Sequence, residues 1–234
     1  MHSKMKRNAL LVLAMLFCTA VRAEEDAILV LDASGSMWGQ IDGRSKIEIA
    51  RDAVRQLTAD WPTANAIGLV AYGHRSKGDC NDIQTLLEPA PLDATAFNTT
   101  VAALNPKGMT PISAAVRHAA AALKYTEQKA TVILISDGEE TCEADPCAVA
   151  DELEALGVDF TAHVIGFDVG DAKAQAQLRC LAENTGGRYR SARNAAELGN
   201  ALDRLVQDKP PLPPTTATLQ APATVAATLP IRVR

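Results

Sequence analysis

The chain has 234 residues, of which 47% are hydrophobic, and it carries a formal net charge of −5. This length and composition are sufficient for one large α/β domain with a sizeable buried core. Because phosphate binding needs a basic surface, the acidic balance argues against nucleic acid as the main partner.

Residues 1–23 have the pattern of a secretory signal peptide: basic residues, then the apolar stretch Ala9–Phe17, then small residues at a cleavage position. The apolar stretch is short for a membrane span, so an uncleaved anchor is the less favoured alternative. Lipoprotein processing at Cys18 is disfavoured by the bulky Phe17. Removing residues 1–23, which contain four basic and no acidic residues, lowers the charge from −5 to −9. We therefore expect a periplasmic or secreted protein with no membrane span after signal removal.

From Ala27 onward, short apolar segments alternate with amphipathic ones, which is typical of a doubly wound α/β fold with a mostly parallel central sheet flanked by helices. The predicted parallel strands are Ala27–Leu31, Ala66–Tyr72, Thr131–Ser136, Phe160–Gly166 and Arg188–Ser191, with one short antiparallel edge strand at Thr85–Glu88. The predicted helices are Lys46–Asp60, Asp93–Leu104, Pro111–Tyr125, Pro146–Leu156, Ala172–Thr185 and Ala195–Val206.

Boundary residues support several of these helices. Thr110 before Pro111 and Asp145 before Pro146 predict an N-cap followed by a first-turn proline, and Gly157 predicts a helix end. The segment "GQIDGRSK" at 39–46 has too few residues between its glycines and lacks the lysine of a phosphate-binding loop, so it predicts a turn.

The predicted domain spans 24–207 and is followed by a proline-rich linker at 208–214, which includes "KPPLPP". The remaining residues, 215–234, are rich in Thr and Val and resemble the start of a β-type segment or a partial second domain. Twenty residues are too few to fold alone. We expect them to pair with another element or to belong to a longer protein.

Oxygen-bearing side chains follow the predicted strands where those strands end. Asp32, Ser34 and Ser36 come after the first strand, Asp137 follows the third parallel strand, and Thr110 precedes a helix. Ligands of open parallel sheets bind at the carboxyl ends of the strands. Carboxylate and hydroxyl oxygens suit a hard divalent cation, so these five residues predict a site for Mg²⁺, with Ca²⁺ or Mn²⁺ as alternatives.

Each of these residues also has an ordinary structural explanation. Ser and Asp after a strand commonly cap the next helix, Thr110 fits an N-cap, and Asp137 with Gly138 fits a turn. The occurrence of all five together favours the metal site.

The Asp-x-Ser-x-Ser motif, followed by Thr110 and Asp137, resembles the metal-ion-dependent adhesion site of von Willebrand factor type A domains. The resemblance covers about residues 26–207 and includes the order of strands and helices. It implies that Ser34, Ser36 and Thr110 bind the metal by their hydroxyls, while Asp32 and Asp137 act through water. Neutral hydroxyls leave much of the cation's charge uncompensated, so such a site is expected to bind an Asp or Glu carboxylate of a protein partner.

Other polar residues are expected near this site. His74 and Arg75 follow the second strand and are candidates for contacting an acidic partner, although an exposed loop histidine without a role is the simpler explanation. Glu139 is a further candidate for contacting a partner. It also begins a group of acidic residues, which predicts either a solvated loop or support for a second cation: Glu139, Glu140, Glu143 and Asp145.

Four cysteines remain after signal removal: Cys80, Cys142, Cys147 and Cys180. An even number in an exported protein predicts two disulfides with three possible connectivities. The loop topology favours Cys80–Cys142 with Cys147–Cys180, and a local Cys142–Cys147 bridge is the rival. The short paired spacing of zinc sites is absent.

These features predict an exported, non-enzymatic binding protein of the adhesion type. The alternative is a magnesium-dependent, phosphatase-like hydrolase in which Asp32 or His74 has a chemical role. Against it, Ser34 stands where aspartyl phosphatases need a second acid. A third possibility is a scaffold module of a larger envelope assembly.

Overall fold

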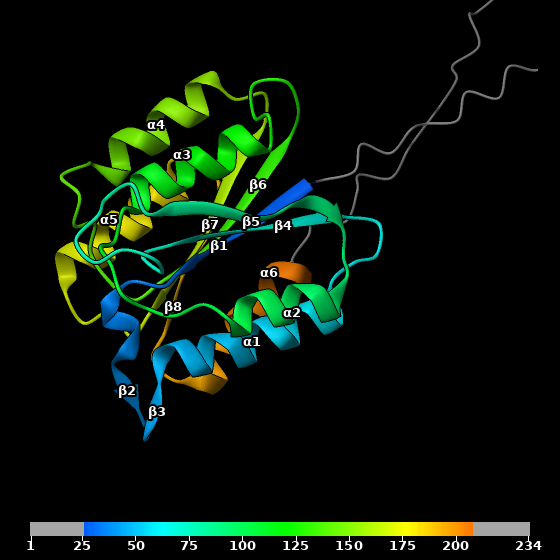
Figure 1. Cartoon of the computed structure of the whole chain (residues 1–234). Coiled ribbons are helices and arrows are strands. Elements are labelled where there is room, and N and C mark those ends of the chain that lie inside the picture. The colour runs from blue at the N-terminus through cyan, green and yellow to red at the C-terminus, as the bar shows by residue number, and fades with distance from the viewer. Residues whose placement is uncertain (1–25, 208–234) are drawn as a thin grey trace, which may run out of the picture.

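A computed structural model describes residues 26–207, and Figure 1 shows them as one central sheet between two layers of helices. The predicted signal peptide, linker and C-terminal segment lie outside the described residues. Within the described part of the chain, no helix is both long and apolar enough to cross a membrane.

The central sheet has six strands in the order β5-β4-β1-β6-β7-β8. Their bounds are β1 Asp26–Asp32, β4 Ala66–Tyr72, β5 Ile83–Pro91, β6 Ala130–Ser136, β7 Phe160–Phe167 and β8 Tyr189–Ala192. Every neighbouring pair is parallel except β4 and β5. From the central β1 the chain builds first toward β5 and then crosses to β6, which confirms the doubly wound fold.

The helices are α1 Lys46–Asp60, α2 Ala94–Ala102, α3 Ile112–Ala122, α4 Pro146–Leu156, α5 Ala172–Glu183 and α6 Ala195–Gln207. Alternate residues of β1 face opposite layers. Ile28 and Val30 pack with α3, α4 and α5, whereas Leu29 and Leu31 pack with α1, α2 and α6. Because both faces are covered, the parallel strands are continuous apolar runs rather than alternating ones.

The helix boundaries follow local chemistry. Ser45 and Glu48 form a reciprocal capping box at the start of α1, and Asp145 caps α4 with Pro146 in its first turn, as predicted. The prediction that Thr110 caps α3 is wrong, because the N-cap position is Pro111 and has no side-chain cap. Glu140, from the loop after β6, accepts the Ser113 N–H at 2.8 Å instead.

Two further details differ from the sequence prediction. The edge strand β5 is longer than expected, since it continues through Pro89 to Pro91. Proline is tolerated there because one side of an edge strand has no ladder partner. The turn at 39–46 contains a small hairpin of β2 (Gln40–Ile41) and β3 (Arg44–Ser45), which projects from the lower left of Figure 1.

Candidate metal centre

The loops at the carboxyl ends of the parallel strands, together with the loop before α3, form one end of the molecule, here called the rim. Asp32 is the last residue of β1 and is fully buried. Its Oδ1 accepts the Ser34 backbone N–H at 2.8 Å, and its Oδ2 accepts the Ser136 hydroxyl at 2.7 Å. These bonds turn the chain sharply into the 3-10 helix η1 (Gly35–Trp38).

The two serines of the motif touch each other and reach Asp137. The hydroxyl oxygens of Ser34 and Ser36 lie 2.9 Å apart, and Ser36 donates to Asp137 Oδ1 at 2.6 Å. Because Ser36 has a single hydroxyl hydrogen, Ser34 is the donor to Ser36. The structure thus places four of the five candidate ligands in one hydrogen-bonded chain from two loops that are far apart in sequence.

Thr110 also lies at the rim. Gly108 forms a parallel bridge with Ser34, which brings the loop before α3 alongside the motif. The Thr110 backbone exchanges two hydrogen bonds with Thr141: its N–H donates to Thr141 Oγ1 at 2.8 Å, and its carbonyl accepts the Thr141 N–H at 3.1 Å. The position of Thr110 therefore depends on the loop after β6.

The two carboxylates interact electrostatically. Burial, and then the negative charge of Asp137, raise the pKa of Asp32 to about 6, although hydrogen bonds from Ser34 and Ser136 act in the opposite direction. Bringing a cation between these carboxylates would relieve the repulsion. The donor set, which contains only carboxylate and hydroxyl oxygens, fits a hard cation such as Mg²⁺.

Within residues 26–207, no group of three or more His, Cys, Asp or Glu side chains is placed to hold a metal ion. A centre with two carboxylates and three hydroxyls is of a different kind, because most of its ligands are neutral.

Lys46, the first residue of α1, also lies at the candidate centre, although its sequence position did not indicate this. Its ammonium group lies 3.1 Å from Asp137 Oδ2 and 3.1 Å from Asp168 Oδ2. Burial acts to lower the pKa of Lys46, but Asp137 and Asp168 outweigh it and raise that pKa, so the group stays charged. Lys46 therefore holds the oxygen of Asp137 that Ser36 does not bind.

We expect Lys46→Met to lower the free energy of unfolding of the metal-free protein by about 2 kcal/mol, because Asp137 then loses its buried partner. Added Mg²⁺ should stabilise this variant more than the wild type, since no fixed positive charge then competes for Asp137. Urea unfolding followed by circular dichroism, with and without MgCl₂, measures both effects. Lys173→Met is the matched control, because Lys173 pairs with Glu139 at the surface. Equal effects of the two substitutions would contradict the role of Lys46.

Ser136 and Tyr72 were also missed. Tyr72 is the last residue of β4 and pairs in register with Asp32, and its hydroxyl donates to Ser136 Oγ at 3.1 Å. Each is a polar residue at the end of an apolar strand, which is visible in the sequence. Their connection to Asp32 depends on the strand register, which the sequence does not show. Together they fix the rotamer of Asp32.

The three residues predicted to contact a partner have local partners in the structure. His74 Nε2 lies 3.1 Å from Gln84 Oε1 on β5, and Glu139 pairs with Lys173. Arg75 binds the buried Asp82 through its side chain and its backbone N–H, and about half of its side chain remains exposed.

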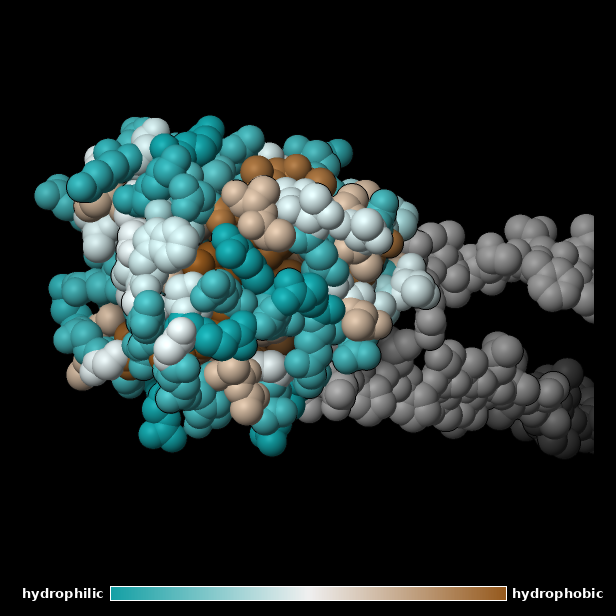
Figure 2. Space-filling view, turned by 60° about the horizontal axis from the view of Figure 1, so that its bottom comes forward, coloured by the Kyte–Doolittle hydropathy of each residue, from teal (hydrophilic) through white to brown (hydrophobic). Residues whose placement is uncertain are grey.

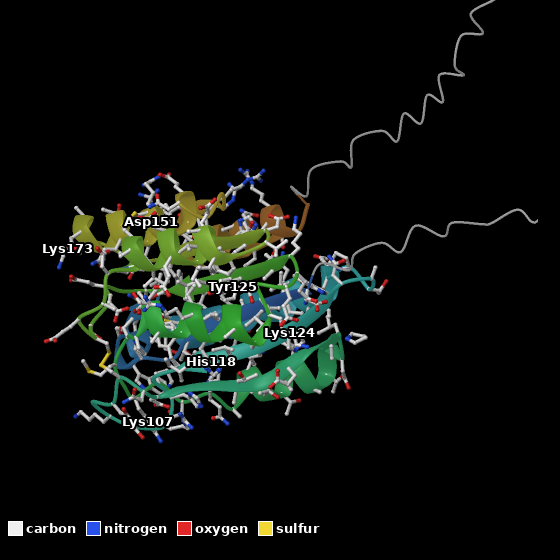
Figure 3. All side chains as sticks on the ribbon, turned by 90° about the horizontal axis from the view of Figure 1, so that it is seen from above. Lys107, His118, Lys124, Tyr125, Asp151 and Lys173 are labelled. Atoms are coloured by element: carbon white, nitrogen blue, oxygen red, sulfur yellow. A yellow bond between two sulfur atoms is a disulfide. The ribbon has the colours of Figure 1, made fainter. Side chains whose placement is uncertain are left out.

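Both favoured disulfides are present. Cys80–Cys142 has a Cα–Cα distance of 5.7 Å and joins two loops of the rim, whereas Cys147–Cys180 has a distance of 5.3 Å and joins α4 to α5. Disulfides appear as yellow bonds at the rim end of Figure 3. Cys142 directly follows Thr141, so the first bridge restrains the segment that holds Thr110.

Residues 27–140 match the model of the von Willebrand factor type A domain. The chain is also 30% identical over 200 residues to the uncharacterized protein YwmD of Bacillus subtilis, and the match covers 82% of this chain and 89% of YwmD. The chain belongs to the von Willebrand factor type A family. The six-stranded sheet with helices on both faces, seen in the described residues 26–207, is therefore the fold of a type A domain.

Two solved structures show the same fold at lower identity. The pilus adhesin SpaC of Lactobacillus rhamnosus GG, in its open conformation, matches with a TM-score of 0.64 and 15% identity, over 79% of this chain and 30% of SpaC. The von Willebrand factor domain of the type V pili tip protein Mfa5 of Porphyromonas gingivalis matches with a TM-score of 0.62 and 17% identity, over 79% of this chain and 94% of that chain.

Proposed function

We propose that this type A domain protein is an exported, non-enzymatic binding protein that engages an Asp or Glu of a partner protein through a divalent cation. Asp32, Ser34, Ser36, Thr110 and Asp137 would hold the cation, with Mg²⁺ as the first candidate.

The observation that carries this proposal is the hydrogen-bonded chain from Ser34 through Ser36 to Asp137. It lies beside the buried carboxylate of Asp32, and Ser36 is exposed to solvent. A cation bound there would keep much of its charge, because hydroxyl ligands are neutral, and it would attract a carboxylate at the open side. The exposed position of Ser36 leaves that side accessible.

Two further observations support export and a protein partner. Two disulfides are typical of proteins in oxidising compartments. The structural neighbours SpaC and Mfa5 are a pilus adhesin and a pilus tip protein. We extend the adhesion role to this chain as a proposal, with a periplasmic or secreted location.

The hydrolase alternative receives no support from the position of Asp32. A nucleophilic carboxylate needs an accessible oxygen, but Asp32 is fully buried and each of its oxygens accepts a hydrogen bond. His74, the other candidate, bonds Gln84 of the edge strand.

Capture from an extract of cell-envelope proteins tests the proposal. Immobilised wild-type chain should retain partner proteins in MgCl₂ and release them in EDTA, whereas Ser36→Ala should retain none. The matched control is Ser76→Ala, another exposed serine of the rim, which should behave as the wild type. Retention that persists in EDTA, or in Ser36→Ala, would contradict metal-dependent binding.

A further inference from the structure

An exposed aromatic ring lies on the same 3-10 helix, η1, as the motif residue Ser36. Trp38 follows Ser36 by two residues and is 50% exposed. Two other large hydrophobic residues in the described part of the chain are exposed, Leu156 and Val158, and they lie at the far end of α4, away from the rim. Figure 2 shows a face that is mainly hydrophilic, with hydrophobic residues in small groups. Trp38 is therefore the exposed large hydrophobic residue closest in sequence to the motif.

The indole of Trp38 is fixed in place. Its Nε1 donates to the carbonyl of Pro106 at 2.9 Å. The following residue, Lys107, donates its N–H to the carbonyls of Ala33 and Gly73 at 3.1 and 2.9 Å. The ring is thus tied to a loop that is itself tied to the strand ends. A pre-positioned ring loses little conformational entropy when a partner binds, which is why Trp is common at the energetic centres of interfaces.

Charge at the rim is unevenly distributed. On the side of Trp38, the loops after β4 and before α3 present the exposed cations Lys77 and Lys107, whereas Arg75 is paired with the buried Asp82 and Asp79 is half-buried. On the other side, the loops after β6 and β7 carry a larger number of carboxylates: Glu139, Glu143, Asp145, Asp168 and Asp171. Lys107 and Lys173 mark the two sides at the left of Figure 3, and Lys173 pairs with Glu139. An approaching carboxylate is repelled by the second side and attracted by the first.

We infer that Trp38 and Lys107 form, with the hydroxyl-lined centre, a single recognition surface for an exposed segment of a partner protein. In that segment, an Asp or Glu contacts the centre. An aromatic or aliphatic residue, one or two positions from this acid along the partner chain, packs on the face of Trp38. The segment runs over the Lys107 side of the rim. This inference rests on the proposed function, to which it adds the chemistry of the partner.

Selection from a phage-displayed library of short random peptides tests the inference. Peptides eluted by EDTA from the immobilised full-length wild-type protein should be enriched in Asp or Glu with an apolar residue adjacent or next but one. With Trp38→Ala, the acid should persist while the apolar enrichment falls to the library background. Leu156→Ala, which removes another exposed hydrophobic side chain far from the rim, should leave the selection unchanged.

Affinities of one selected peptide provide the quantitative measurement. Trp38→Ala should weaken peptide binding by about tenfold or more, while the affinity for MgCl₂ alone, measured by calorimetry, stays unchanged. Trp38→Phe, which keeps a ring without the N–H, should recover part of the loss.

Each outcome has a separate meaning. Acidic peptides without an apolar neighbour, or a Trp38→Ala selection identical to that of the wild type, would overturn the inference and leave the proposed function intact. Apolar, Trp38-dependent peptides that stay bound in EDTA and are recovered only by a second elution at low pH would refute the proposed function and with it the shared surface. The expected pattern, acid and apolar residue together and both lost in Ser36→Ala, supports both.

Discussion

Asp32→Asn is expected to abolish the stabilisation of this protein by Mg²⁺. A ligand present at about 100 times its Kd raises the free energy of unfolding by about 2.7 kcal/mol, and this increment should appear in the wild type and vanish in the variant. The reason is that Asp32 carries one of the two negative charges of the candidate centre. Thermal unfolding with and without MgCl₂, together with calorimetric titration, measures the effect.

The substitution is chosen so that the metal-free fold survives. Asparagine has nearly the same shape, keeps an oxygen for the Ser34 N–H, and removes a charge that burial disfavours, as the raised pKa of Asp32 shows. Asp42→Asn is the matched control, because Asp42 lies at the exposed tip of the β2–β3 hairpin with a φ of 52°, which asparagine tolerates. An Asp32→Asn protein that responds to Mg²⁺ as Asp42→Asn does would exclude Asp32 from the centre.

Removing the Cys80–Cys142 bridge by a double Cys→Ser substitution is expected to lower both stability and metal affinity. The sequence separation of 62 residues corresponds to about 4 kcal/mol of lost chain-entropy stabilisation. The loss of affinity follows from the position of Thr141, which bonds Thr110 and directly precedes Cys142. Denaturant unfolding measures the first effect, and MgCl₂ titration at a temperature where the variant is folded measures the second.

The second bridge provides the comparison. Cys147–Cys180 closes a sequence separation of 33 residues, for which the same entropy argument also predicts about 4 kcal/mol, but it joins α4 to α5 and restrains no candidate ligand. Its removal should lower stability without a selective loss of metal affinity. If both double variants bind Mg²⁺ equally well, the rim bridge has no part in positioning Thr110.

The strands and most helices could be predicted because their signals are local. β1, β4 and β6 are continuous apolar runs, and α1 and α4 begin at side-chain caps in their own sequence. The cap of α3 could not be predicted, since Glu140 reaches its N-terminus from another loop. The length of β5 was underestimated because Pro89 is a strand breaker everywhere except at an edge.

The residues of the candidate centre also divide into those that the local sequence indicates and those that only the tertiary structure brings together. The motif residues were recognised from their spacing, whereas Lys46, Ser136 and Tyr72 were not. Tyr72 reaches Asp32 through Ser136, and this depends on β1 lying between β4 and β6 in a particular register. Lys46 appears in the sequence as an ordinary first helical residue, and only the packing of α1 beside the ends of β6 and β7 brings it to Asp137 and Asp168.

Because α6 runs back from the end of β8, the first residue of β1 and the last turn of α6 lie at the same pole of the domain, at the right of Figure 1. A strand of seven residues spans about 23 Å, so this pole is separated from the rim loops by the full height of the sheet. Tethering the domain there, to a bead, a fibre or a surface, would point the loops outward and leave them unobstructed.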